Sequence, residues 1–113
     1  MPELCKTYRN LSLLATGQLI KGGVGRVKGY HIINQAAAAR FVKFYDKATA
    51  PTVGTDTPKI TIALAATSQA TLPVGADGIE FQLGIGIGAT NLIADNDATA
   101  PSANDVVVNV FYG

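Results

Sequence analysis

The stretch RFVKFYDKATAPTVGTDTPKITIAL, residues 40–64, decides the fold class of this chain. Residues 41–45 are mostly aromatic or β-branched, which is typical of a pleated, half-buried strand. Further on, Ile60, Ile62 and Leu64 alternate with smaller or polar residues, which is the two-residue period of a strand with one buried face. Between these segments lie prolines, a glycine and threonines, which favour turns. The stretch therefore predicts two strands joined by a long loop.

Further short strands are predicted because apolar runs recur about every 10–14 residues, between turn signals built from glycine, proline and aspartate. The expected strands include residues 19–20, 24–34, 70–72, 79–83, 84–88 and 106–112. The alanines of residues 36–39 are too few to form a helix in water. This spacing indicates an antiparallel sandwich or barrel, and we expect an all-β fold with a single jelly-roll-like β-sandwich of about seven or eight strands.

Length and composition restrict the domain organisation and the class of partner. The 113 residues are 48% hydrophobic and 15% charged, which suits one folded domain rather than a disordered chain. The net charge of +1 argues against general binding to nucleic acid or to a membrane surface. Residues 1–10 are polar without a period, so we expect an N-terminal arm that is ordered only where something packs on it. Residues 11–113 would form the single β-sandwich domain.

The glycines at positions 84, 86 and 88 alternate with Ile85 and Ile87. Strict alternation places all three glycines on one face of a strand, whereas a dinucleotide-binding loop has its glycines at a strand-to-helix turn. We therefore expect a strand whose glycine face lets another backbone or a ring approach closely.

The sequence Asp95-Asn96-Asp97 resembles the start of a calcium-binding loop. Its sixth position holds Ala100 instead of glycine, however, and its twelfth holds Val106 instead of glutamate. We expect a solvated turn, and an ion shared with a neighbouring subunit is an alternative that the sequence leaves open.

Cys5 is the single cysteine, and it would need His31, the single histidine, in support of a nucleophilic role. We expect instead a small apolar thiol and a hydrogen-bonded histidine. The chain shows no serine–histidine–aspartate arrangement, phosphate-binding loop or aromatic platform for nucleic acid. We therefore expect a non-enzymatic protein without catalytic, cofactor-binding or metal-ligating residues, and with no cofactor.

A series of phrases over residues 28–113 resembles a group of short structural proteins of tailed-bacteriophage virions, of the capsid decoration or cement type. The phrases are Tyr30-His31-Ile32-Ile33-Asn34, VKFYDK at residues 42–47, APTVGTDTP at residues 50–58, GIEF at residues 78–81, GIGI at residues 84–87, DNDAT at residues 95–99 and the apolar strand that ends in Tyr112. Residues 1–27 carry no part of the resemblance.

The resemblance implies a virion protein, made in the cytoplasm of the host bacterium, that binds and stabilises the shell of major capsid protein. The implied partners are the major capsid protein and further copies of this chain in a dimer or trimer, with neither nucleic acid nor membrane. A tail or neck component and a receptor- or glycan-binding module of the virion are the alternatives. The candidate interface lies in the loop and the arm: Lys47, Thr49, Pro51, Thr52, Val53, Thr55 and Asp56, with Leu4, Tyr8 and Arg9.

Overall fold

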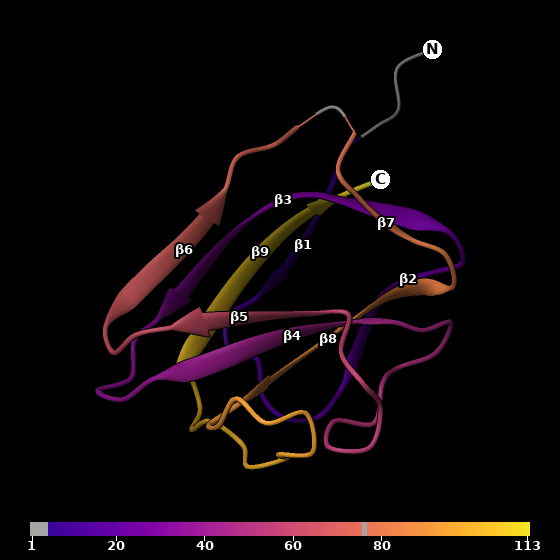
Figure 1. Ribbon diagram of the computed structural model, residues 1–113. Coiled ribbons are helices and arrows are strands. Elements are labelled where there is room, and N and C mark those ends of the chain that lie inside the picture. Colours follow the sequence, from indigo (N-terminus) through magenta and orange to yellow (C-terminus); the bar gives the residue numbers. More distant parts are fainter. Residues whose placement is uncertain (1–4, 76) are drawn as a thin grey trace.

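The computed structural model describes residues 5–75 and 77–113 (Figure 1). In these ranges the chain has no helix, and its strands form two antiparallel sheets. The strands are β1 (Lys6–Asn10), β2 (Gln18–Gly22), β3 (Gly25–Asn34), β4 (Arg40–Asp46), β5 (Ile60–Leu64), β6 (Ser68–Leu72), β7 (Ile79–Phe81), β8 (Gly84–Thr90) and β9 (Val106–Tyr112). The predicted all-β sandwich is confirmed.

The two sheets follow the order of a jelly roll. Sheet A has the order β1-β9-β3-β6, with β7 also paired to β3, and sheet B has the order β2-β8-β4-β5. The pairs β4–β5, β3–β6, β2–β8 and β1–β9 lie progressively further apart in sequence and alternate between the two sheets. This is the pattern of one long antiparallel ribbon that is rolled into a sandwich.

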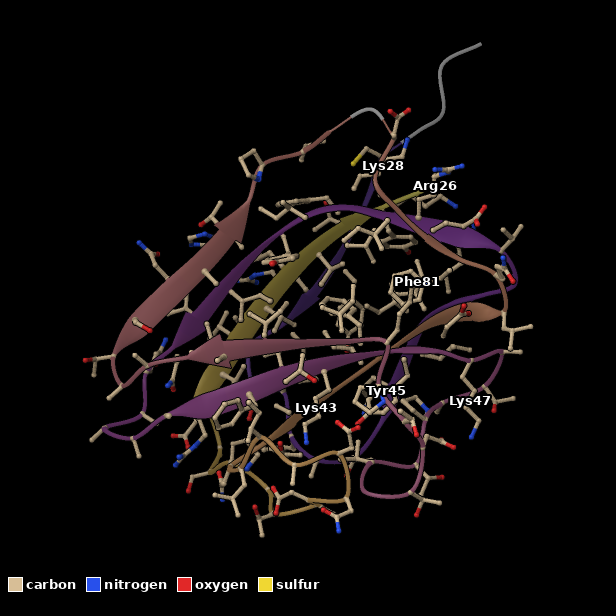
Figure 2. The ribbon with its side chains drawn as sticks, viewed as in Figure 1. Arg26, Lys28, Lys43, Tyr45, Lys47 and Phe81 are labelled. Carbon is tan, nitrogen blue, oxygen red and sulfur yellow. The ribbon has the colours of Figure 1, made fainter. Side chains whose placement is uncertain are left out.

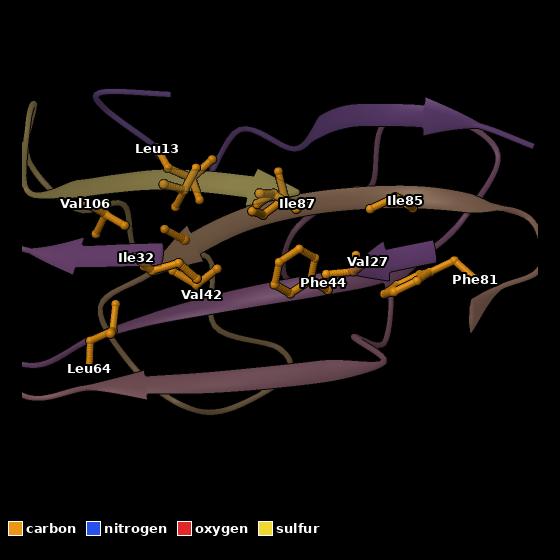
Figure 3. Close-up of a cluster of buried hydrophobic side chains, with 13 residues drawn as sticks. Leu13, Val27, Ile32, Val42, Phe44, Leu64, Phe81, Ile85, Ile87 and Val106 are labelled. Carbon is orange, nitrogen blue, oxygen red and sulfur yellow. The ribbon is translucent and has the colours of Figure 1, made fainter. Parts of the chain in front are cut away.

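The hydrophobic core fills the space between the two sheets (Figure 3). Strands β4 and β8 of sheet B contribute Val42, Phe44, Ile85 and Ile87, which alternate with residues that face away from the core. Strands β3 and β9 contribute the opposing side chains, Val27, Ile32, Val106, Val108 and Val110. The alternation follows from the pleat of each strand, which sends successive side chains to opposite faces.

Strand β3 contributes core side chains from both an odd-numbered and an even-numbered position. Val27 and Ile32 are separated by five positions, so a regular strand would send them to opposite faces. The pairing with β9 shifts register between Val27 and Gly29, and this irregularity brings both side chains into the core. A single extra residue in one strand is enough to move every following side chain of that strand to the opposite face of the sheet.

The arm predicted over residues 1–10 is, in its described part, an edge strand of the chain's own sheet A. Lys6–Asn10 forms β1, which pairs with β9, and the Tyr8 side chain packs against the core. With this strand the described residues have nine strands, against the seven or eight that the sequence predicts. The described residues contain no helix long and apolar enough to cross a bilayer.

Candidate functional site

The outer face of sheet B is covered by two loops, which follow β4 and β8 (Figure 1). We call residues 47–59 the first covering loop and residues 91–105 the second covering loop. Below them, β8 presents its glycine face, which consists of Gly84, Gly86 and Gly88 and is fully buried. The prediction of a glycine face that admits close approach is confirmed, because the first covering loop lies directly on it.

Two apolar side chains of the first covering loop insert into the space that the glycine face leaves. A Cβ atom on Gly86 would lie 2.8 Å from Pro51 Cδ, and one on Gly88 would lie 2.6 Å from Val53 Cγ2. Pro51 also contacts Gly17 on its other side, where an added Cβ would collide with its carbonyl oxygen. The loop is therefore held by packing that only glycine on β8 allows.

Hydrogen bonds fix the shape of the same loop. The Asp56 carboxylate accepts from Lys47 Nζ at 2.6 Å and from the Thr52 backbone N–H at 2.7 Å. The Thr52 carbonyl in turn accepts from the N–H groups of Thr55 and Asp56, at 3.1 and 2.9 Å. The hydrogen bond from Lys47 is the main cause that lowers the pKa of Asp56, followed by the one from Thr52. Loop shape is thus set by polar contacts on one side and by apolar packing on the other.

The second covering loop is organised around a buried lysine of β4. Lys43 is 0% exposed, and its Nζ donates to the Ala94 carbonyl at 2.6 Å. Burial lowers the pKa of Lys43, and the negative charges of Asp97 and Asp95 act against that lowering. The ammonium group therefore occupies the inner side of the acidic turn that resembles a calcium loop, and it supplies that turn with a positive charge from the chain itself.

Tyr45 lies beside Lys43 on β4 and points toward the two loops (Figure 2). Its ring is buried, and its hydroxyl has no hydrogen-bond partner among the described residues. Burial raises the pKa of Tyr45 to about 12, with smaller contributions from the negative charges of Asp56 and Asp95. The two loops touch one another nearby, since a Cβ on Gly54 would lie 2.9 Å from the Ala98 Cβ.

The structure divides the predicted interface residues of the loop into three groups by their exposure. Pro51 and Val53 are buried against β8, so they support the loop from below instead of forming its outer surface. Thr49, Thr52 and Thr55 are exposed on the first covering loop. Lys47 and Asp56 are partly exposed and bound to each other. The second covering loop adds two exposed apolar side chains, Leu92 and Ile93, which are not among the residues predicted from the sequence.

The predicted interface residues of the arm lie on sheet A. Tyr8 is half-buried, and its hydroxyl accepts a hydrogen bond from Asn10 Nδ2 at 3.1 Å. Arg9 is exposed on β1. Leu4 lies outside the described residues. The structure therefore does not bring the loop residues and the arm residues together, because β1 belongs to sheet A and the loop covers sheet B.

The two residues considered for nucleophilic chemistry lie on different parts of sheet A. Cys5 is exposed directly before β1, whereas His31 lies on β3 with β9 between the two strands. His31 Nδ1 shares a 2.8 Å hydrogen bond with Thr71 Oγ1 of β6. Within the described ranges, histidine, cysteine, aspartate and glutamate side chains do not gather in threes at metal-binding distance.

Asp46, at the end of β4, organises the turn between β7 and β8. Burial disfavours its charged form, but backbone N–H groups of Leu83, Gln82 and Gly84 donate to its carboxylate at 2.8, 3.1 and 3.4 Å. Together with the positive charge of Lys59, these hydrogen bonds outweigh burial and lower the pKa of Asp46. The ionised carboxylate therefore stabilises the fold.

We expect acid to destabilise the protein in a defined range of pH. The pKa of Asp46 is lower in the folded chain than in the unfolded chain, so its contribution is complete above the unfolded pKa of about 3.9. It is lost as the pH falls through the lower folded pKa. The pKa values of Asp56 and Asp97 are lowered as well, which adds to the same loss.

Urea unfolding at pH 7 and at pH 3 measures the size of this effect. We expect Asp46→Asn to lower the free energy of unfolding at pH 7 by about 1 kcal/mol, after solvent screening is allowed for. The variant should also lose less stability than the unmodified protein between the two pH values. Equal losses in both proteins would show that Asp46 does not contribute.

Comparisons of this chain with models of protein families, with curated proteins and with solved structures find no match.

Proposed function

We propose that this protein is a non-enzymatic structural protein of a tailed-phage virion, and most specifically a capsid decoration protein that binds the shell of major capsid protein. The observation that carries the proposal is the way the first covering loop is held. This loop contains the phrase on which the resemblance to virion proteins depends, and Pro51 and Val53 anchor it on the glycine face of β8.

A loop that is fixed before binding favours docking on a large, regular partner. An interface that must order its loops on contact loses part of its binding free energy to conformational entropy, and a preset loop avoids most of that loss. The exposed threonines at positions 49, 52 and 55 offer hydroxyl groups at the surface of such a loop. Leu92 and Ile93 on the second covering loop, 58% and 62% exposed, add apolar area on the same side of the sandwich.

The jelly-roll topology agrees with this proposal without deciding it. The same arrangement of strands occurs in viral capsid domains, in lectins and in metabolic enzymes, so function has to be argued from the surface. A particle presents many copies of one docking site, and a homo-oligomer that engages several of them at once gains avidity from modest single contacts. We therefore keep the dimer or trimer as part of the proposal.

Co-sedimentation with particles that lack this protein tests the proposal. We expect the unmodified protein to bind saturably to such particles, and Thr52→Arg to weaken the binding by about tenfold or more, which is about 1.4 kcal/mol. The matched control is Gln69→Arg, which places the same charge on exposed β6 of the other sheet and should leave binding unchanged.

Two outcomes would contradict different parts of the proposal. Absence of binding to the capsid, with binding to isolated tails or necks, would favour the tail or neck alternative. Binding that is lost with Gln69→Arg and kept with Thr52→Arg would place the interface away from the covering loops.

A further inference from the structure

The free edge of β1 differs from the other strand edges of the sandwich. Its pairing with β9 is regular over all five residues, from Lys6 opposite Tyr112 to Asn10 opposite Val108. Among the described residues, β1 pairs with β9 alone, so the backbone groups on its other side are open for pairing. An open, regular edge is a template for an added strand.

The remaining edges are less suited to accept a strand. β2 has a register shift between Leu19 and Lys21, and such irregularities turn an edge away from regular pairing. β7 is only three residues long. β5 and β6 contact each other where the two sheets meet, so neither edge stands alone.

The charges on β1 indicate the chemistry of a partner. Lys6 and Arg9 are exposed, and no carboxylate of the described residues lies within ion-pair distance of either. Elsewhere, arginines of the sheets do have such partners: Arg26 lies 3.9 Å from Glu80, and Arg40 lies 3.2 Å from Asp105. The open edge therefore carries positive charge that the fold does not neutralise.

A second copy of this chain is a poor occupant for this edge. If two copies of β1 paired antiparallel about Tyr8, Arg9 of one strand would face Thr7 of the other, and Lys6 would face Asn10. The two Arg9 side chains would then lie diagonally across the pair, within reach of each other, and the four positive charges would have no carboxylate between them.

We infer that the β1 edge accepts an extended acidic segment of another protein as an added strand of sheet A. Backbone hydrogen bonds to the open edge would supply affinity that does not depend on sequence, and carboxylates beside Lys6 and Arg9 would supply specificity. Leu11, which follows the strand and is 50% exposed, offers an apolar contact at its end. The inference does not depend on the capsid proposal, since any protein with such a segment would fit.

Binding of two designed peptides to the full chain tests this inference. Because Lys6 and Arg9 are three positions apart on a regular strand, their side chains point to opposite faces of β1. The acidic peptide is therefore ten residues long with glutamate at every third position among threonines and valines, and the control peptide has lysine in place of each glutamate. Titration calorimetry measures affinity, and amide NMR shifts identify the strand that is contacted. We expect the acidic peptide to bind with the largest shifts in β1 and β9, and to weaken as salt screens the charges. The control peptide should not bind.

Charge variants of the chain separate an accepting edge from non-specific attraction. We expect Lys6→Glu combined with Arg9→Glu to weaken binding of the acidic peptide at least tenfold, and Lys6→Gln combined with Arg9→Gln to weaken it less. Lys21→Glu, on the irregular edge of β2, is the control and should change the affinity less than twofold. All variants must keep the unfolding midpoint of the parent, which shows that β1 remains in place.

Three results of the peptide titrations would overturn the inference, and a fourth comes from sedimentation. The three are failure of the acidic peptide to bind, equal binding of both peptides, and NMR shifts that lie outside sheet A. In the first case the charges of β1 only protect the edge from pairing, which is a common role for lysine on edge strands. A dimer in sedimentation experiments that dissociates on Lys6→Glu and Arg9→Glu would show instead that a second copy occupies the edge.

Discussion

Gly86→Val is expected to lower the free energy of unfolding by about 3 kcal/mol, because the added side chain would enter space that Pro51 already occupies. A Cβ at this position lies 2.8 and 3.0 Å from two side-chain atoms of Pro51. The proline cannot withdraw easily, since its carbonyl group is packed against Gly17. The higher strand propensity of valine offsets only part of this cost.

Urea unfolding with Gly75→Val as control measures this effect. Gly75 has nothing within 4 Å of an added Cβ and does not have a positive φ, so valine there should change stability by less than about 0.5 kcal/mol. Hydrogen exchange should show in addition that the first covering loop loses protection in Gly86→Val. If both variants unfold at the same urea concentration, the loop does not depend on the glycine face.

Lys43→Ala is expected to lower the free energy of unfolding by about 3 kcal/mol, which is unusual for a lysine. The side chain is 0% exposed, so the substitution removes packed methylene groups and the hydrogen bond from Nζ to the Ala94 carbonyl. The Ala94 carbonyl then keeps only the backbone N–H of Asp97 as donor, at 3.0 Å, and Asp95 and Asp97 lose the positive charge of Lys43.

Lys43→Met separates packing from charge in this prediction. Methionine restores most of the side-chain volume without the ammonium group, so we expect it to recover about half of the loss. Lys6→Ala, on exposed β1, is the matched control and should cost less than about 0.5 kcal/mol. A cost for Lys43→Ala no larger than that of Lys6→Ala would contradict the role of Lys43 in holding the second covering loop.

The strands were predictable from the sequence wherever one face of a strand is apolar. The alternation of Ile60, Ile62 and Leu64 predicts β5. The alternating glycines of β8 predict a face that another backbone or ring can approach closely. β1 was not predictable in this way. An edge strand needs little buried surface, and β1 has only Tyr8 packed against the core, so its sequence shows no period.

The candidate site was only partly predictable, because burial in the covering loops depends on partners far away in the sequence. Pro51 and Val53 look like ordinary turn residues until the glycine face of β8 is placed beneath them. Lys43 would normally be assigned to solvent as a charged residue. The sequence around Lys43 nonetheless indicates its burial. The adjacent residues are Val42 and Phe44, and the residues on the same face of the strand are Phe41 and Tyr45. A strand that is apolar on both faces is typical of one that is covered on both faces.

The copy number of this protein in purified virions tests the central claim most directly. Quantitative mass spectrometry compares its abundance with that of the major capsid protein in the same particle. A capsid decoration protein follows the symmetry of the shell, so we expect hundreds of copies in a fixed ratio to the capsid subunits. A count from about six to a few tens would match a neck or tail ring and contradict the decoration role, and absence from the particle would contradict a virion function altogether.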